Sequence, residues 1–158
     1  MREIDFLWRV ALGGLRTGDF VQKYKISGTK VGCMFCDCAL ETTEHLFTEC
    51  PGLIDVRDVL VEFVSGVGAT VDRGDAQSLK ELLCLGLSQF EEVKEIEKRV
   101  FRLVAAANSI VWCRRNQLLF VGQAGGSLAP VVRQKCKMLS DSFLLSKSLE
   151  TDDTNTSI

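Results

Sequence analysis

The sequence predicts an all-α fold, a small helical domain with a cysteine-rich turn packed near its N-terminal part. Apolar residues recur at intervals of three and four over several segments, which is the spacing of one helix face. No stretch of useful length alternates between apolar and polar residues, as a half-buried strand would. The chain has 158 residues, of which 46% are hydrophobic, so it is long enough to bury a core.

The N-terminal part, residues 1–52, is expected to contain short helices and the cysteine-rich turn. An amphipathic helix is predicted over residues 5–12, where two glycines end it. Thr17 is predicted to cap a second short helix over residues 18–24. These helices would lead directly into the cysteine-rich turn.

The second part, residues 53–148, is expected to be a helical domain. Pro51 can occupy the first turn of the helix that opens it, because the amide hydrogen that proline lacks has no partner there. Two capping-box patterns predict further helix starts at Ser78 and Ser88.

The longest periodic segment, residues 89–120, is predicted to be a long central helix. It has two apolar stripes about a quarter turn apart, so we expect it to pack on two sides. Ser127 is predicted to cap a last helix. Residues 149–158 are polar and are predicted to form a disordered tail.

Four residues between positions 33 and 50 follow a spacing that metal chemistry explains. Their pattern is C-x2-C-x8-H-x4-C, and it contains the only histidine of the chain. Zn²⁺ prefers about four ligands in a tetrahedron, and thiolate sulfur with imidazole nitrogen suits it. A short helix over residues 41–49, capped by Thr42 or Thr43, can bring the histidine to the C-x2-C turn. The sequence therefore predicts a structural, zinc-knuckle-like Cys3His site for Zn²⁺, formed by Cys33, Cys36, His45 and Cys50.

The alternative is a buried cluster of reduced cysteines beside an ordinary surface histidine, since cysteine is often buried without being a ligand. Cys38 lies two residues after a ligand and could compete for the metal. Cys84, Cys113 and Cys136 are expected to be free, non-catalytic thiols. Seven cysteines and no signal segment favour an intracellular, reducing compartment, with nucleus and cytoplasm left open. The longest uncharged stretch contains glycines and a proline, so no membrane helix is predicted.

Charges are segregated along the chain, although the net charge is only −2. Residues 98–137 include eight lysines or arginines and no acidic residue. Residues 1–32 have six basic against three acidic residues, whereas residues 37–97 have fourteen acidic against four basic residues. Such blocks predict a basic face that can meet phosphates. The alternative is that charges sort by helix face without function.

Several short motifs follow one another in an informative order. Trp8 precedes the segment GLRTGDF at positions 14–20 and then the C-x2-C turn. The segment ETTEHLF follows at positions 41–47 and leads to Cys50 and Pro51. Further on, positions 112–116 read WCRRN, and a phenylalanine follows at position 120.

Together these landmarks, over residues 6–121, resemble the zinc-binding region at the C-terminal end of non-LTR retrotransposon reverse transcriptases. The resemblance implies a helical accessory region that helps bind the element's RNA or its target DNA near the polymerase. It implies Zn²⁺ as cofactor, nucleic acid as partner, and the polymerase part of the same element as a further partner. Cys38 departs from the family pattern. A fragment of a longer protein, a decayed copy and a domesticated protein are all compatible with the sequence.

Nucleic-acid binding is expected to use mainly phosphate contacts rather than base stacking. Arg115 and Asn116 match the Arg-Asn pair of the family; in the alternative, Arg115 pairs with an acidic residue of the middle region and Asn116 braces the helix end. A second hypothesis is a protein-interaction module, in which the zinc only holds the helices together and the acidic middle of the chain binds a partner. The candidate nucleic-acid residues are Arg16, Lys23, Lys25, Lys30, Arg114, Arg115 and Asn116.

Catalysis by this chain is not expected. There is no Tyr-x-Asp-Asp segment, in which a reverse transcriptase would hold its metal ions. The glycines at positions 122–126 lack the lysine and the preceding strand of a phosphate-binding loop. A catalytic zinc keeps an open coordination position, whereas three cysteines and a histidine would close the shell.

Overall fold

The computed structural model describes residues 3–69, 95–122 and 125–152. Throughout these residues the protein consists of helices and connecting loops, without a strand. The all-α prediction is therefore confirmed. Within the same residues, none of the helices combines the length and the apolar character needed to cross a membrane.

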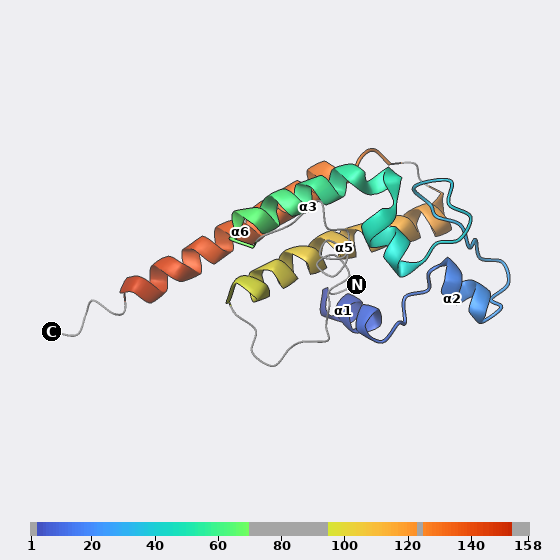
Figure 1. Cartoon of the computed structure of the whole chain (residues 1–158), viewed down its shortest axis with the longest axis horizontal. Helices are drawn as coiled ribbons and strands as arrows, with labels where there is room; N and C mark the ends of the chain where they lie inside the picture. Colours follow the sequence, from blue (N-terminus) through green and yellow to red (C-terminus); the bar gives the residue numbers. More distant parts are fainter. Residues whose placement is uncertain (1–2, 70–94, 123–124, 153–158) are drawn as a thin grey trace.

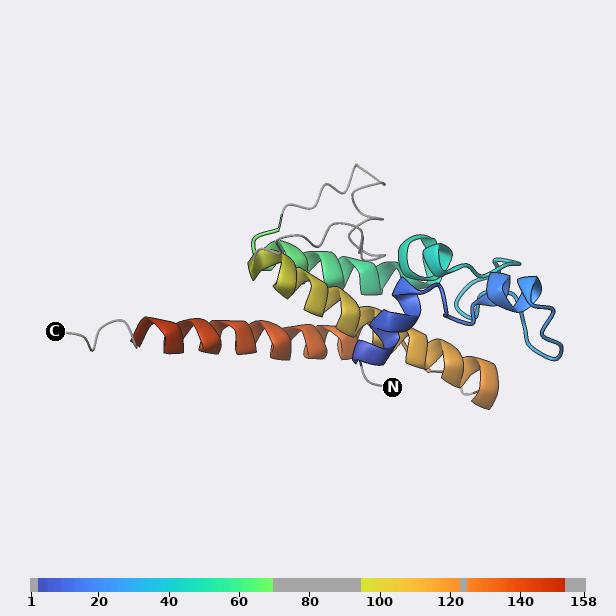
Figure 2. The same ribbon diagram turned by 90° about the horizontal axis from the view of Figure 1, so that it is seen from below.

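Three long helices form the body of the molecule (Figure 1). They are α3 (Ile54–Gly66), α5 (Glu95–Val121) and α6 (Ala129–Asp152), and each of them contacts the other two. The short helix α1 (Glu3–Ala11) packs against α5. The cysteine-rich segment lies at one end of this body, together with the short helix α2 (Gly18–Lys23), as Figures 1 and 2 show.

Helix α5 is central because its sequence lets neighbours approach closely on several sides. Every residue from position 103 to position 109 is buried, and three successive alanines stand in the middle of this run. Small side chains allow helix backbones to pack at short range on more than one face. Helix α5 accordingly contacts α1, α3 and α6, which confirms the prediction that it packs on at least two sides.

Helix α6 begins where the sequence predicted it. The hydroxyl oxygen of Ser127 accepts a hydrogen bond from the amide of Ala129 at 3.1 Å, which caps the first turn. The buried face of the helix includes Val132, Cys136 and Phe143. The guanidinium of Arg133 lies on the surface and binds both carboxylate oxygens of Glu62 in α3, at 2.8 and 2.9 Å, and this bond lowers the pKa of Glu62.

The last helix ends later than the sequence prediction. Helix α6 continues to Asp152, whereas the disordered tail was predicted from position 149. The segment contains no glycine or proline, and leucine, lysine and glutamate favour the helix. Figure 2 shows this end of α6 extending beyond α3 and α5. The rest of the predicted tail and the helix starts predicted at Ser78 and Ser88 lie outside the described residues.

Candidate metal centre

The structure brings the four predicted metal ligands together. The ligand atoms of Cys33, Cys36, His45 and Cys50 all lie within 4.8 Å of one another. Sγ of Cys33 is 3.7 Å from Sγ of Cys50, and Sγ of Cys36 is 3.3 Å from Nε2 of His45. Two sulfurs on a tetrahedral zinc with bonds of about 2.3 Å would be roughly 3.8 Å apart. The set therefore has the size of a tetrahedral metal shell, and the sulfurs are too far apart for a disulfide.

The C-x2-C turn is shaped by backbone hydrogen bonds. The amide of Phe35 donates to Sγ of Cys33 at 3.4 Å, and the amide of Cys33 donates to the carbonyl of Cys38 at 3.0 Å. An amide directed at a sulfur stabilises the thiolate, which is the form that binds a metal. The turn therefore orients Cys33 for metal binding.

A single π-helical turn, η1 (His45–Glu49), aligns the other two ligands. The amide of Cys50 donates to the carbonyl of His45 at 2.7 Å, a bond that spans five residues. In an α-helix, residues five apart would point about 140° away from each other. The wider turn instead brings His45 and Cys50 to the same side. The sequence predicted an ordinary helix over residues 41–49, and the structure corrects this because α-helical winding would separate the two ligands.

Thr42 is the residue that caps this turn. Its hydroxyl oxygen accepts a hydrogen bond from the amide of His45 at 2.9 Å. Of the two threonines proposed from the sequence, Thr42 therefore performs the capping.

Residues 3–56 match the family model described as zinc-binding in reverse transcriptase. Over residues 3–56, called the zinc-binding region below, the chain is similar to the members of this family. The match confirms the family resemblance over this segment and includes all four ligands. No curated protein and no solved structure matches the chain.

The hydrogen bond between Cys33 and Cys50 changes the pKa of both thiols. The hydrogen bond with Cys50 is the main cause that lowers the pKa of Cys33 to about 4, and the same bond raises the pKa of Cys50. A lowered thiol pKa favours the thiolate, which is the form of cysteine that binds a metal.

The other described cysteines lie outside the cluster. Sγ of Cys38 hydrogen-bonds to the carbonyl of Leu40 at 3.3 Å and does not belong to the set of four. Cys113 is an exposed free thiol, and Cys136 is buried among α3, α5 and α6, where burial raises its pKa to about 11. Cys84 lies outside the described residues.

Two glycines of the zinc-binding region allow close backbone approaches. A Cβ atom at Gly18 would lie 1.8 Å from the carbonyl oxygen of Val31. A Cβ atom at Gly52 would lie 2.1 Å from the carbonyl oxygen of Phe35. Only glycine fits at either position, so both residues hold the ligand turn against its neighbours. Sequence reasoning included Gly18 in a motif without finding this role and did not single out Gly52, since each close approach joins segments that are distant in the sequence.

A buried ion pair joins the zinc-binding region to helix α5. Nε and Nη2 of Arg115 lie 2.8 and 2.7 Å from Oε1 of Glu41, and both residues are almost fully buried (1% and 0% exposed). Arg115 also donates to Oδ1 of Asn116 at 3.2 Å and lies over the ring of Trp112. Burial raises the pKa of Glu41, and the bond to Arg115 opposes that shift.

This pair changes the predicted nucleic-acid surface. Arg115 pairs with the buried Glu41, which is the alternative that the sequence left open for this residue. Arg115 is therefore not part of the exposed basic surface. Asn116 is partly exposed and hydrogen-bonds to Arg115. Arg114 is also partly exposed and lies against Gly125, between the end of α5 and the start of α6, where it lines a hollow of about 340 Å³. The four remaining candidates, Arg16, Lys23, Lys25 and Lys30, are all exposed.

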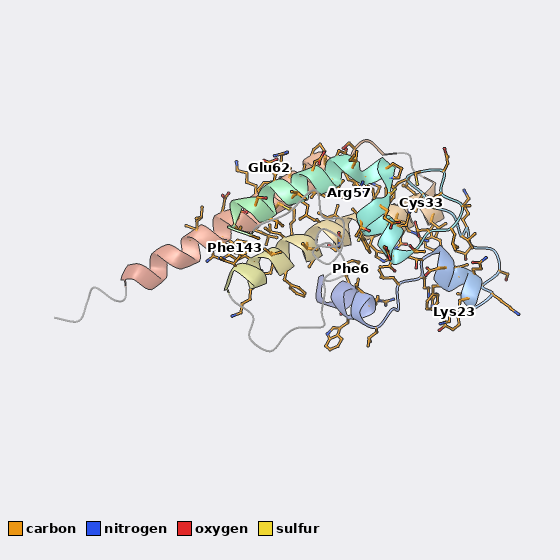
Figure 3. The ribbon with its side chains drawn as sticks, in the orientation of Figure 1. Phe6, Lys23, Cys33, Arg57, Glu62 and Phe143 are labelled. Carbon is orange, nitrogen blue, oxygen red and sulfur yellow. The ribbon has the colours of Figure 1, made fainter. Side chains whose placement is uncertain are left out.

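The ligand cysteines are also connected to helix α3. Nη1 of Arg57 donates to the carbonyl of Cys50 at 2.6 Å. Leu46, Phe47 and Leu53, which flank the last two ligands, belong to the hydrophobic core. Figure 3 shows Arg57 on α3 and Cys33 at the same end of the molecule. The metal centre is therefore built into the end of the helical body.

Proposed function

We propose that this chain is a non-catalytic zinc-binding accessory domain of the reverse-transcriptase type, which binds nucleic acid through its exposed basic residues. The observation that supports it most is the closed Cys3His set next to four exposed cationic side chains of the same segment. RNA of the element and target DNA are both candidate ligands.

Cys33, Cys36, His45 and Cys50 would hold the ion, and zinc fits their spacing and their donor atoms. A metal bound there supplies structural cross-linking, because four ligands from the chain leave no position for a substrate. The residues themselves fix the relative positions of the C-x2-C turn, the π-helical turn and the start of α3. This supports a structural rather than a catalytic role.

The exposed basic residues support phosphate binding. Arg16, Lys23, Lys25 and Lys30 lie on or next to α2 and its connection to the ligand turn, and Figure 3 shows Lys23 directed away from the body of the molecule. The one acidic residue on α2, Asp19, accepts a hydrogen bond from the hydroxyl of Thr17 at 2.6 Å, at the end of the helix opposite to Lys23 and Lys25. Cations grouped in this way attract the phosphate backbone without reading sequence.

A salt series with the zinc-loaded chain tests the proposal. Binding to labelled RNA and DNA should be measurable at low salt, and its affinity should fall steeply and linearly on a log–log plot as salt rises. Absence of binding to either nucleic acid at the lowest salt would reject it.

The second candidate is a zinc-stabilised protein-interaction module. Apolar side chains on α6 favour it, since Met138, Leu144 and Leu145 are each more than 60% exposed. Exposed apolar side chains that form a contiguous patch are typical of contact surfaces. If the chain binds neither RNA nor DNA at the lowest salt, the protein-interaction module becomes the better interpretation.

A further inference from the structure

The C-terminal end of α2 presents an exposed aromatic ring between two lysines. Tyr24 follows the last residue of α2 and is 57% exposed. Its ring lies 4.5 Å from the ring of Phe20, centroid to centroid, and Phe20 is partly buried one helical turn earlier. Phe20 therefore supports the ring from the protein side, while much of the tyrosine stays open to solvent.

The lysine that follows Tyr24 adopts a conformation that lysine disfavours. Lys25 has φ of 51°, and it is the only non-glycine residue with positive φ among the described residues. The amide of Ile26 donates to the carbonyl of Val21 and the amide of Lys25 to that of Gln22, the two bonds of a Schellman motif. Glycine is the usual residue at this left-handed position. A lysine held there against its backbone preference indicates a use for its side chain.

Lysines stand on both sides of Tyr24 in the sequence, and one of them lies close to the ring. Nζ of Lys23 lies 5.4 Å from the centroid of Tyr24, and Lys23, Lys25 and Lys30 are all exposed. An aromatic face flanked by cations matches a base and its neighbouring phosphates. A duplex keeps its base faces stacked inside, whereas a single strand can offer them to a protein.

We propose that Lys23, Tyr24 and Lys25 form a stacking platform for an unpaired base, so that the region prefers single-stranded over double-stranded nucleic acid. This inference rests on the proposed function and adds the class of nucleic acid and the residue that selects it. It also adds base stacking to the phosphate contacts expected from the sequence, through a residue that was not among the candidates.

The test compares Tyr24→Leu, Tyr24→Phe and the parent chain, all zinc-loaded. The probes are labelled oligo(dT), oligo(U) and a DNA duplex, each about 20 nucleotides long. This length exceeds the binding site of one small domain. Tyr24→Leu keeps an apolar side chain without a π-face, and it should weaken binding to the single strands about tenfold. Binding to the duplex should change less than twofold. Tyr24→Phe should bind as the parent does, and the two single strands report whether RNA or DNA is favoured.

Lys25→Gly separates binding from folding. Glycine relieves the positive φ, so the melting temperature should equal or exceed that of the parent. Loss of the cation should nevertheless weaken binding to all probes and reduce the salt slope by about one.

The outcomes distinguish the two proposals. If the parent binds none of the probes at low salt, both proposals are overturned. Suppose that the parent binds, and that Tyr24→Leu either lowers the affinity for single strands and duplex equally or leaves both unchanged. In both cases only the stacking platform is rejected. An increase in melting temperature without loss of binding in Lys25→Gly would remove Lys25 from the platform.

Discussion

Single residues decide the metal centre, and Cys38 is the one that the sequence alone could not place. Its thiol hydrogen-bonds to Leu40, while the four ligand atoms gather without it. The distinction arises from the direction of the C-x2-C turn, in which Cys33 and Cys36 point to one side. A pattern of residue types does not contain that direction.

Replacing ligand cysteines should therefore have a different effect from replacing Cys38. We expect Cys36→Ser to lose the metal and to unfold at least residues 30–52, because metal binding is coupled to the folding of such sites. Cys38→Ser should retain about one zinc per chain, by the four-ligand rule. Metal analysis and hydrogen exchange measure both effects. Full occupancy in Cys36→Ser with loss in Cys38→Ser would show that Cys38 is the ligand.

Glycine contacts provide a second test at this scale. Gly18→Ala and Gly52→Ala should each lower the free energy of unfolding by about 2 kcal/mol or more, since a rigid backbone carbonyl occupies the space that the methyl group needs. Gly126→Ala is the matched control, because nothing lies within 4 Å of a Cβ atom there. Urea denaturation of the zinc-loaded proteins measures the changes. Equal stability of all three variants would mean that the backbone yields at these contacts.

At the scale of elements, periodicity predicted α5 and α6 well, and capping chemistry found Ser127 and Thr42. Thr17 stands at the N-cap position of α2 as predicted, but its hydroxyl donates to Asp19 and does not accept a capping hydrogen bond from the helix. The π-helical turn was not predictable, because its five-residue bond follows from the need to align His45 and Cys50 on one metal. The helix propensities of the individual residues do not include this requirement for ligand alignment. The pair between Glu41 and Arg115 was one of two interpretations of the sequence. Charge patterning shows that residues 98–137 are basic, but it cannot show which of their arginines turns inward.

The buried pair between Glu41 and Arg115 should tie the zinc-binding region to α5. Arg115→Met alone should cost about 3–5 kcal/mol of unfolding free energy, because it leaves a buried carboxylate without its partner. Replacing both residues by methionine should recover most of that loss, since similar volume is filled without charge. Urea denaturation of the two single variants and the double variant completes the cycle. A double variant as unstable as the sum of the single variants would show that the two residues act independently.

At the scale of the whole molecule, the helical body is separate from the exposed basic residues on and next to α2, which are Arg16, Lys23, Lys25 and Lys30. Helices α3, α5 and α6 bury the core, and the metal centre closes one end of it. Segregated charge predicted a basic face, but the structure divides the basic residues between internal partners such as Arg115 and exposed ones near α2. Only the folded chain makes this division, because it depends on which helix faces meet.

Neutralising the exposed lysines should then weaken binding without disturbing the fold. Changing Lys23, Lys25 and Lys30 to glutamine should reduce the affinity for RNA and DNA at low salt. It should also flatten the slope of log K against log salt by up to about 3, near one unit for each lost phosphate contact. The three side chains are exposed and do not belong to the hydrophobic core, so zinc content and melting temperature should match those of the parent.

The matched control changes the same three lysines to arginine, which keeps the charge at every position. This variant should retain the salt slope of the parent, and fluorescence anisotropy over a series of salt concentrations measures all three proteins. If the glutamine variant binds as tightly as the parent and with the same slope, the lysines are ordinary solvated surface. The exposed apolar side chains of α6 would then be the better candidate for a binding surface, because the exposed lysines would not bind nucleic acid.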